Sequence, residues 1–134
     1  MKVEELMVGN WVTVKHAHRQ PSTEKVYGIG QTHVLIKMSS GIYSFEYERI
    51  QPSPITEDFL LKNDFRKKEF KDHNVLMIFN LGMSIVKEET GWFINVSKAN
   101  EHLHNFTEVS VLINYVHEMQ HILRITGIEK EVKI

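Results

Sequence analysis

Short runs of alternating residues dominate the first part of the chain. In the run NWVTVKH, Val12 and Val14 alternate with their neighbours, which is the period of a half-buried β-strand. Three further runs follow at close spacing, separated by glycine and serine turns: EKVYGIG, THVLIKM and IYSFEYERI. Several short strands divided by such turns indicate a small barrel or sandwich. We therefore expect an SH3-like β-barrel over residues 1–54.

Two prolines mark the end of this first region. Pro52 and Pro54 cannot donate a hydrogen bond to a central ladder, so the first sheet is expected to end there. Thr56 is a good N-cap for a short helix over residues 57–62, whose first turn is acidic. Asn63 can then take the left-handed conformation that often follows a helix.

Five strand-like runs and a second helix follow. The runs are KKEFKDH, NVLMIFNLG, MSIVKEE, GWFINVSK and FTEVSVLI, with ANEHLHN as a polar loop before the last. Asn114 can cap the final helix, YVHEMQHILRIT, which is expected to stop at Gly127. Residues 55–134 are thus predicted to form a second domain with the order α-β-β-β-β-β-α. The whole chain is predicted to be an α+β protein, an SH3-like barrel followed by an antiparallel sheet with two short-to-medium helices.

Composition excludes several classes of protein. A net charge of −1 and a pI near 6.7 create no long-range field that would gather polyanions. The absence of cysteine excludes disulfides and thiolate zinc sites and fits a reducing compartment. Glu4 and Glu5 stand where a signal peptide needs a basic start, and no long apolar run could span a membrane. We expect a cytoplasmic protein without a membrane partner.

Three segments carry a resemblance to a known group of proteins: VEELMVGNWV, IQPSPITEDFLLKNDF and YVHEMQHILRITGIE. They resemble small proteins of prophages and mobile elements of gut bacteria, which share an ELRIGN-like opening, a PIPLTEE-LLK-GF-like middle and a YVHQLQNLYFALTGEEL-like end. In that group the position of Glu118 is usually Gln and that of His121 is commonly Asn. The resemblance therefore implies that HEMQH is a local variant of HQLQN, and it implies no catalytic residue.

The stretch HEMQH nevertheless matches H-E-x-x-H, the zinc-binding helix of metallopeptidases. His117 and His121 stand one turn apart, and Glu118 would be the general base for a metal-bound water. Catalytic zinc needs a third protein ligand. The extended form of the motif fails, because Arg124 replaces its glycine and Gly127 replaces its histidine.

A third ligand from upstream, His102 or His104, keeps a zinc-dependent hydrolase as an alternative. Our preferred interpretation is a histidine pair at the edge of an apolar stripe formed by Leu112, Val116, Met119 and Leu123, with Glu118 facing solvent. The two H-x-H pairs, His16/His18 and His102/His104, have the spacing that places two imidazoles on one strand face. Both pairs flank predicted loops, and we interpret them as solvated loop histidines.

A basic strip, residues 62–71, holds five basic residues against two acids, with Phe65 and Phe70 interleaved. A nucleic-acid interface would use the cations for phosphate and the rings for stacking. The alternation of the strip favours an edge strand whose lysines discourage aggregation. A nucleic-acid-associated accessory factor acting through Lys62–Lys71 is the third alternative.

The last candidates for a binding site are five aromatic residues: Trp11, Trp92, Tyr43, Phe45 and Tyr47. We expect them in the core, although in an SH3-like unit they would line a ligand groove. No phosphate-binding loop is indicated, because no helix opens after Gly28 and Gly30. The sequence thus predicts a non-catalytic binding or assembly protein with an unknown protein partner. It predicts no catalytic residue, no cofactor and no metal ligand.

Overall fold

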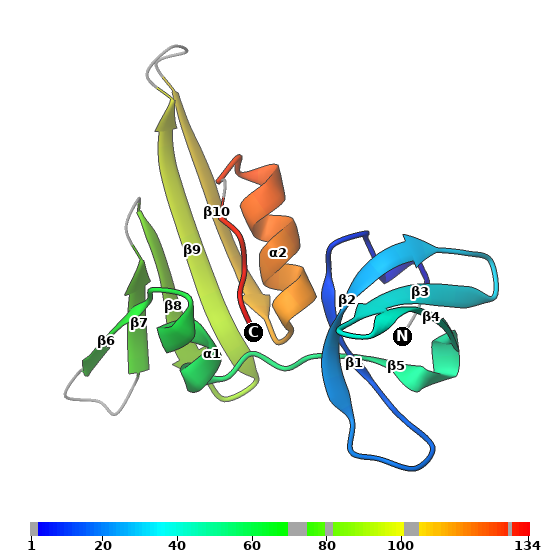
Figure 1. The fold of residues 1–134 in the computed structure, drawn as a ribbon. Coiled ribbons are helices and arrows are strands. Elements are labelled where there is room, and N and C mark those ends of the chain that lie inside the picture. The colour runs from blue at the N-terminus through cyan, green and yellow to red at the C-terminus, as the bar shows by residue number, and fades with distance from the viewer. Residues whose placement is uncertain (1–2, 70–74, 80–81, 101–104, 129) are drawn as a thin grey trace. The chain divides into compact units, whose positions relative to one another are not determined.

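The computed structural model describes residues 3–69, 75–79, 82–100, 105–128 and 130–134. It contains two five-stranded antiparallel sheets and two α-helices (Figure 1), which confirms the α+β class. The chain divides into two compact units, Met1–Pro54 with Tyr115–His117, and Ile55–Asn114 with Glu118–Ile134. In the described part of the chain, no helix is long and apolar enough to cross a bilayer.

The first unit holds a sheet with the strand order β4-β3-β2-β1-β5. Its elements are η1 (Val3–Glu5), β1 (Trp11–Val14), β2 (Ser22–Ile29), β3 (His33–Met38), β4 (Gly41–Glu46), η2 (Tyr47–Arg49) and β5 (Ile50–Pro52). The described residues form no closed barrel, because β4 and β5 are the two edges of this sheet. Pro52 lies on the edge strand β5, where its missing N–H costs no ladder bond.

The run IYSFEYERI was expected to form one strand, and this prediction is wrong. Its first half is β4, which pairs with β3, and its end belongs to β5, which pairs with β1. Strands β4 and β5 are the two edges of the sheet, so the chain must pass from one edge to the other between them. The 3-10 helix η2 lies in this connection. Tyr47 therefore leaves the strand alternation on which the prediction relied.

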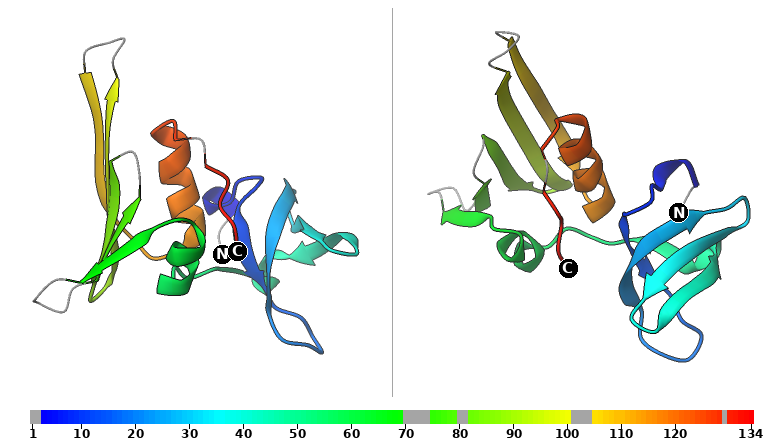
Figure 2. Two further views of the ribbon diagram at one scale, coloured as in Figure 1. Left: turned by 60° about the vertical axis from the view of Figure 1, so that its left-hand side comes forward. Right: turned by 45° about the horizontal axis from the view of Figure 1, so that its top comes forward.

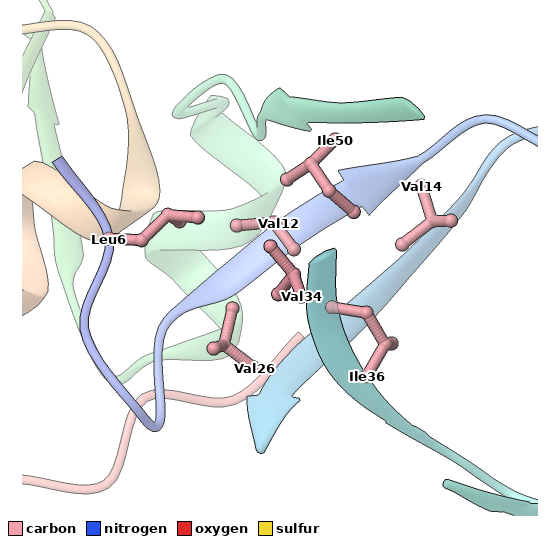
Figure 3. Packing of buried hydrophobic residues seen from close by; sticks show 7 residues of the cluster. All are labelled: Leu6, Val12, Val14, Val26, Val34, Ile36 and Ile50. Atoms are coloured by element: carbon pink, nitrogen blue, oxygen red, sulfur yellow. The ribbon is translucent and has the colours of Figure 1, made fainter. Parts of the chain in front are cut away.

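The core of the first unit follows directly from the alternation along its strands. Val12 and Val14 are fully buried, and so are Val34 and Ile36 on β3, two residues apart. The apolar cluster around them is compact (Figure 3) and consists of Leu6, Val12, Val14, Val26, Val34, Ile36 and Ile50. Burial of such branched side chains contributes roughly 1.5–3 kcal/mol each to folding, so this small sheet has a core of its own.

The second unit holds a meander with the strand order β10-β9-β8-β7-β6. Its elements are α1 (Glu57–Lys62), β6 (Arg66–Glu69), β7 (Val75–Phe79), β8 (Met83–Glu88), β9 (Gly91–Asn100), β10 (Asn105–Ile113) and, from Glu118 on, α2 (Val116–Ile125). Helix α1 has the predicted bounds, and the hydroxyl of Thr56 accepts a hydrogen bond from the Phe59 N–H at 3.1 Å. The predicted N-cap is thus confirmed.

The exit from α1 differs from the prediction. Asn63 has φ −101° and is not left-handed, whereas the next residue, Asp64, has φ +71°. Asn63 stays in the last turn because its carboxamide is buried and donates to the Phe59 carbonyl at 2.9 Å. An aspartate tolerates the left-handed region better than most side chains, so the turn is displaced by one residue.

Both helices of the second unit cover the same face of its sheet, as Figure 2 shows with the sheet seen from its edge. On that face, Met77, Ile85 and Ile94 are cross-strand neighbours and fully buried. Met119 and Leu123 of α2 are buried as predicted. Leu112, assigned to the same stripe, instead lies on β10 and is exposed, because it points to the opposite face with its partner Phe93.

The hairpin of β9 and β10 is longer than predicted. Residues expected in the polar loop ANEHLHN belong partly to its strands, because Asn100 pairs with Asn105. Strand β8 accompanies β9 only as far as Val96. His102 and His104 lie outside the described residues.

Candidate functional site

The stretch HEMQH forms the beginning of helix α2. His117 was expected at the border of the core, but only 4% of its surface is exposed. Its ring stacks on that of Tyr115, with the centroids 5.9 Å apart and the planes inclined by 11°. A helical wheel of α2 does not include Tyr115, so this ring contact could not be read from the helix alone. His121, one turn later, is half-buried.

Glu118 was predicted to face solvent, and its half-buried side chain does lie in an exposed hydrogen bond, but with a partner that was not predicted. Its Oε1 accepts a hydrogen bond from the backbone N–H of Asn114 at 3.0 Å. Glu118 is the third residue of α2, and an acid at that position commonly reaches back to an N–H before the helix, where the helix dipole also favours its charge. Tyr115, and not the expected cap Asn114, directly precedes the first residue of the helix.

The carboxylate of HEMQH contacts the backbone that precedes its helix. A zinc hydrolase would need the Glu118 carboxylate beside a metal-bound water, whereas here it accepts a backbone N–H. Among the described residues, no group of three or more His, Asp or Glu side chains could hold a metal ion. Burial lowers the pKa of His121, the Arg124 charge lowers it further, and the Glu118 charge opposes both.

The pair His16 and His18 lies in the loop after β1. His16 hydrogen-bonds through Nε2 to the Ser22 hydroxyl at 2.7 Å, and its ring meets that of Phe45 edge-on at 5.8 Å. Burial, followed by the charge of Arg19, lowers the pKa of His16. His18 is exposed, as expected for a loop histidine.

The basic strip is built around β6, which is an edge strand as predicted. Phe65 is only 3% exposed and packs against Phe79 with the ring centroids 5.3 Å apart. It is therefore not available to stack on a base. Lys67 forms an ion pair with Glu57 at 2.7 Å, which reduces the charge that phosphate would meet. Phe70 and Lys71 lie outside the described residues.

The aromatic residues predicted for the core differ in their burial. Trp92 is buried and donates its indole N–H to the Ile55 carbonyl at 3.2 Å. Trp11 is half-buried beneath the Lys25 ammonium, 5.4 Å from the ring centroid. Phe45 and Tyr47 pack against the first core from its margin. Tyr43 is 44% exposed, which contradicts the prediction.

Tyr43, Phe45 and His16 together form what we call the aromatic surface. Tyr43 and Phe45 are two residues apart on β4 and face the side of their cross-strand partners Ile36 and Val34. Tyr43 lies exposed on that side because β4 is an edge strand, and its hydroxyl bonds to that of Ser40 at 2.8 Å.

Sequence reasoning missed a second set of polar contacts, which lies in the second unit. Asn63 and Asp64 contact residues near the C-terminus, namely Lys133 and Lys130. The burial of Ile128 and Val132 on either side of Lys130 follows an apolar–x–Lys–x–apolar pattern in the sequence. That pattern is the one signal that could have drawn attention to this segment.

Comparison of the chain with protein-family models, with curated proteins and with solved structures gave no match. The function must therefore be inferred from the residues themselves.

Proposed function

We propose that this protein is a non-catalytic binding or assembly protein whose first unit is an SH3-like module for a protein partner. The aromatic surface is the observation that carries this proposal. Its exposed ring, Tyr43, lies on a sheet with its own buried core. A cytoplasmic role in a prophage or mobile element is part of the proposal, and it rests on the sequence resemblance described above.

The connectivity of the first sheet supports the SH3-like assignment. Strands β1 to β4 form a meander, and β1 also pairs with the last strand, β5. A 3-10 turn, η2, joins β4 to β5. This order of strands with a short turn before the last one is the arrangement of SH3-like folds.

The aromatic surface has the chemistry that a peptide partner would need. Aromatic side chains offer large contact areas at a low entropic cost and are frequent anchors in interfaces. Modules of the SH3 type bind extended proline-rich segments on aromatic residues. Tyr43 offers both an exposed ring and a hydroxyl, and Phe45 with His16 continues the aromatic area next to it. We assign an extended, proline-rich segment of a protein as the partner.

The chemistry around α2 supports a non-catalytic role. Glu118 accepts a hydrogen bond from the Asn114 N–H. For the hydrolase alternative, this carboxylate would have to give up that hydrogen bond. A third zinc ligand would also have to come from outside the described residues. The accessory-factor alternative would need Phe65 to stack on a base, but Phe65 is buried in the core. Neither alternative is favoured by a specific contact.

A library of displayed proline-rich peptides tests the proposal. We expect binders selected on the unchanged protein to lose most of their affinity for Tyr43→Ala, because the central exposed ring is removed. Tyr27→Ala is the matched control, since Tyr27 is exposed in the same unit but lies at the bulge of β2, away from β4. Binders that tolerate Tyr43→Ala, or a selection that yields none, would contradict the assignment.

A further inference from the structure

The carboxamide of Asn63 contacts the backbone of a residue near the C-terminus. Its Nδ2 donates to the Lys133 carbonyl at 2.7 Å, and the Lys133 N–H donates to its Oδ1 at 2.8 Å. Asn63 is completely buried, whereas the Lys133 side chain is exposed. A side chain that pairs with both backbone groups of one residue binds it as a neighbouring strand would, irrespective of that residue's side chain. The contact thus recognises peptide backbone.

The residues before Lys133 supply side-chain recognition. Ile128 and Val132 are 8% and 5% exposed. Between them, the Lys130 ammonium lies 3.0 Å from Asp64 Oδ2 and 5.0 Å from the centroid of the Phe79 ring. An ion pair and a cation–π contact on one lysine select for a cation at that place. The pattern that is bound is therefore apolar–x–Lys–x–apolar.

The groups that bind this segment are held by other parts of the second unit. Asn63 Nδ2 also donates to the Phe59 carbonyl of α1 at 2.9 Å, and this bond orients the carboxamide without help from Lys133. The Phe79 ring is supported by Phe65. A receptor that is oriented before binding loses little entropy when a ligand arrives.

The bound segment itself is attached in a way that permits release. Its described residues, 128 and 130–134, form no strand of the sheet, so its departure breaks no ladder. It follows Gly127, which has φ +70°. Glycine reaches this conformation at no steric cost and can change direction there.

We propose that Asn63, Asp64 and Phe79 form a peptide-recognition site, which the chain's own C-terminal segment occupies and which in trans binds an apolar–x–Lys–x–apolar segment of a partner protein. The C-terminal segment then competes with the partner for the same groups. This inference is independent of the proposed aromatic surface, because all of the residues involved belong to the second unit.

A labelled peptide with the sequence GIEKEVKI, that of residues 127–134, tests the proposal on the full-length chain. The double variant Ile128→Asp and Val132→Asp should release the segment while it leaves the receptor residues unchanged. We expect the peptide to bind this variant at least about tenfold more tightly than the unchanged chain, because a tethered competitor has a high effective concentration. Equal binding to both chains, or binding to neither, would overturn the proposal.

Matched peptides identify which contacts matter. Alanine in place of the residue corresponding to Lys133 should leave the affinity unchanged, since only its backbone is bound, whereas aspartate in place of Val132 should abolish binding. Asp64→Asn in the double variant tolerates the left-handed backbone but removes the charge, and it should weaken binding several-fold. Unaltered binding after Asp64→Asn would contradict the role of the ion pair. If the unchanged chain forms a concentration-dependent dimer and the peptide dissociates it, the partner is a second copy of the chain, and the proposal of a different partner protein is wrong.

Hydrogen exchange on the unchanged chain decides the question even if the double variant does not fold. We expect the Lys133 amide, bonded to Asn63, to exchange at least about a hundredfold faster than the Ile94 amide of β9, an interior strand of the sheet, because the Lys133 contact opens locally. The same exchange rate and the same dependence on denaturant at both amides would show that the segment is an inseparable part of the fold, and the proposal would then be wrong.

Discussion

Glu118 Oε1 accepts a hydrogen bond from the backbone N–H of Asn114 at 3.0 Å. The residue that would be the general base of an H-E-x-x-H motif therefore stabilises the start of the helix that carries it. The motif places residue types at the right spacing, but it does not specify which donor lies next to the carboxylate. In this chain one such donor is the backbone N–H of Asn114, just before the helix.

Removal of the Glu118 carboxylate should destabilise the protein. Glu118→Ala is expected to lower the free energy of unfolding by about 1 kcal/mol, the usual cost of losing a helix cap. Glu118→Gln keeps an acceptor oxygen and loses only the charge, so its cost should be smaller. Urea unfolding followed by circular dichroism measures both values. Glu131→Ala, at an exposed glutamate outside the helices, is the control, and an equal loss in the control would argue against the cap.

Zinc should not be retained by HEMQH. Two imidazoles on one helix supply too few protein ligands for a tightly held ion, and the carboxylate between them accepts a backbone N–H. After incubation with zinc and dialysis, metal analysis should find no stoichiometric zinc. One zinc per chain that disappears in both His117→Ala and His121→Ala would establish a metal site, with His102 or His104 as the first candidates for its third ligand.

His121 should make the stability depend on pH. Burial lowers its pKa below the ordinary value of 6.5, so the unfolded chain binds a proton more readily than the folded chain. The resulting stabilisation is fully present above pH 6.5 and is lost as the pH falls from 6.5 through the folded pKa. Charges facing the ring are Arg124, which adds to this shift, and Glu118, which opposes it.

The variant His121→Asn isolates this effect. As the pH is lowered from 7 to 5, the unfolding free energy of the unchanged chain should fall relative to that of the variant, because asparagine does not titrate. Titration of the His121 ring by NMR, in the folded chain and again in urea, measures the pKa shift directly. A folded pKa equal to or above that in urea would contradict the prediction.

Local signals in the sequence predicted those features that depend on neighbouring residues. Helix α1 was predictable because Thr56 caps it and the acids of its first turn follow directly. The exposure of Tyr43 could not be predicted in this way. Alternation shows which face of the sheet a residue lies on, but it does not show that its strand is an edge strand. The contact of Asn63 with Lys133 joins residues 70 positions apart, and no local pattern specifies such a pair.

Two glycines with positive φ provide a quantitative test of the turn geometry. Gly82, before β8, has φ +75°, and an added Cβ would lie 2.3 Å from the Ser97 carbonyl oxygen. Gly9 has φ +93°, but an added Cβ would meet no atom within 4 Å. An alanine at Gly9 thus suffers only the backbone strain, about 1–2 kcal/mol. An alanine at Gly82 suffers that strain and a backbone collision, which no side-chain rotation can relieve.

Gly82→Ala should therefore lower the free energy of unfolding by about 2 kcal/mol more than Gly9→Ala, the additional cost being that of overpacking. The Gly82 carbonyl accepts a hydrogen bond from the Ser97 N–H at 2.9 Å, so a shift that relieves the collision also disturbs this contact between the turn and β9. Urea unfolding gives the two free energies, and exchange of the Ser97 amide shows whether this contact has opened. Equal losses in the two variants, with an unchanged Ser97 amide, would mean that the turn adapts freely and that the collision does not limit stability.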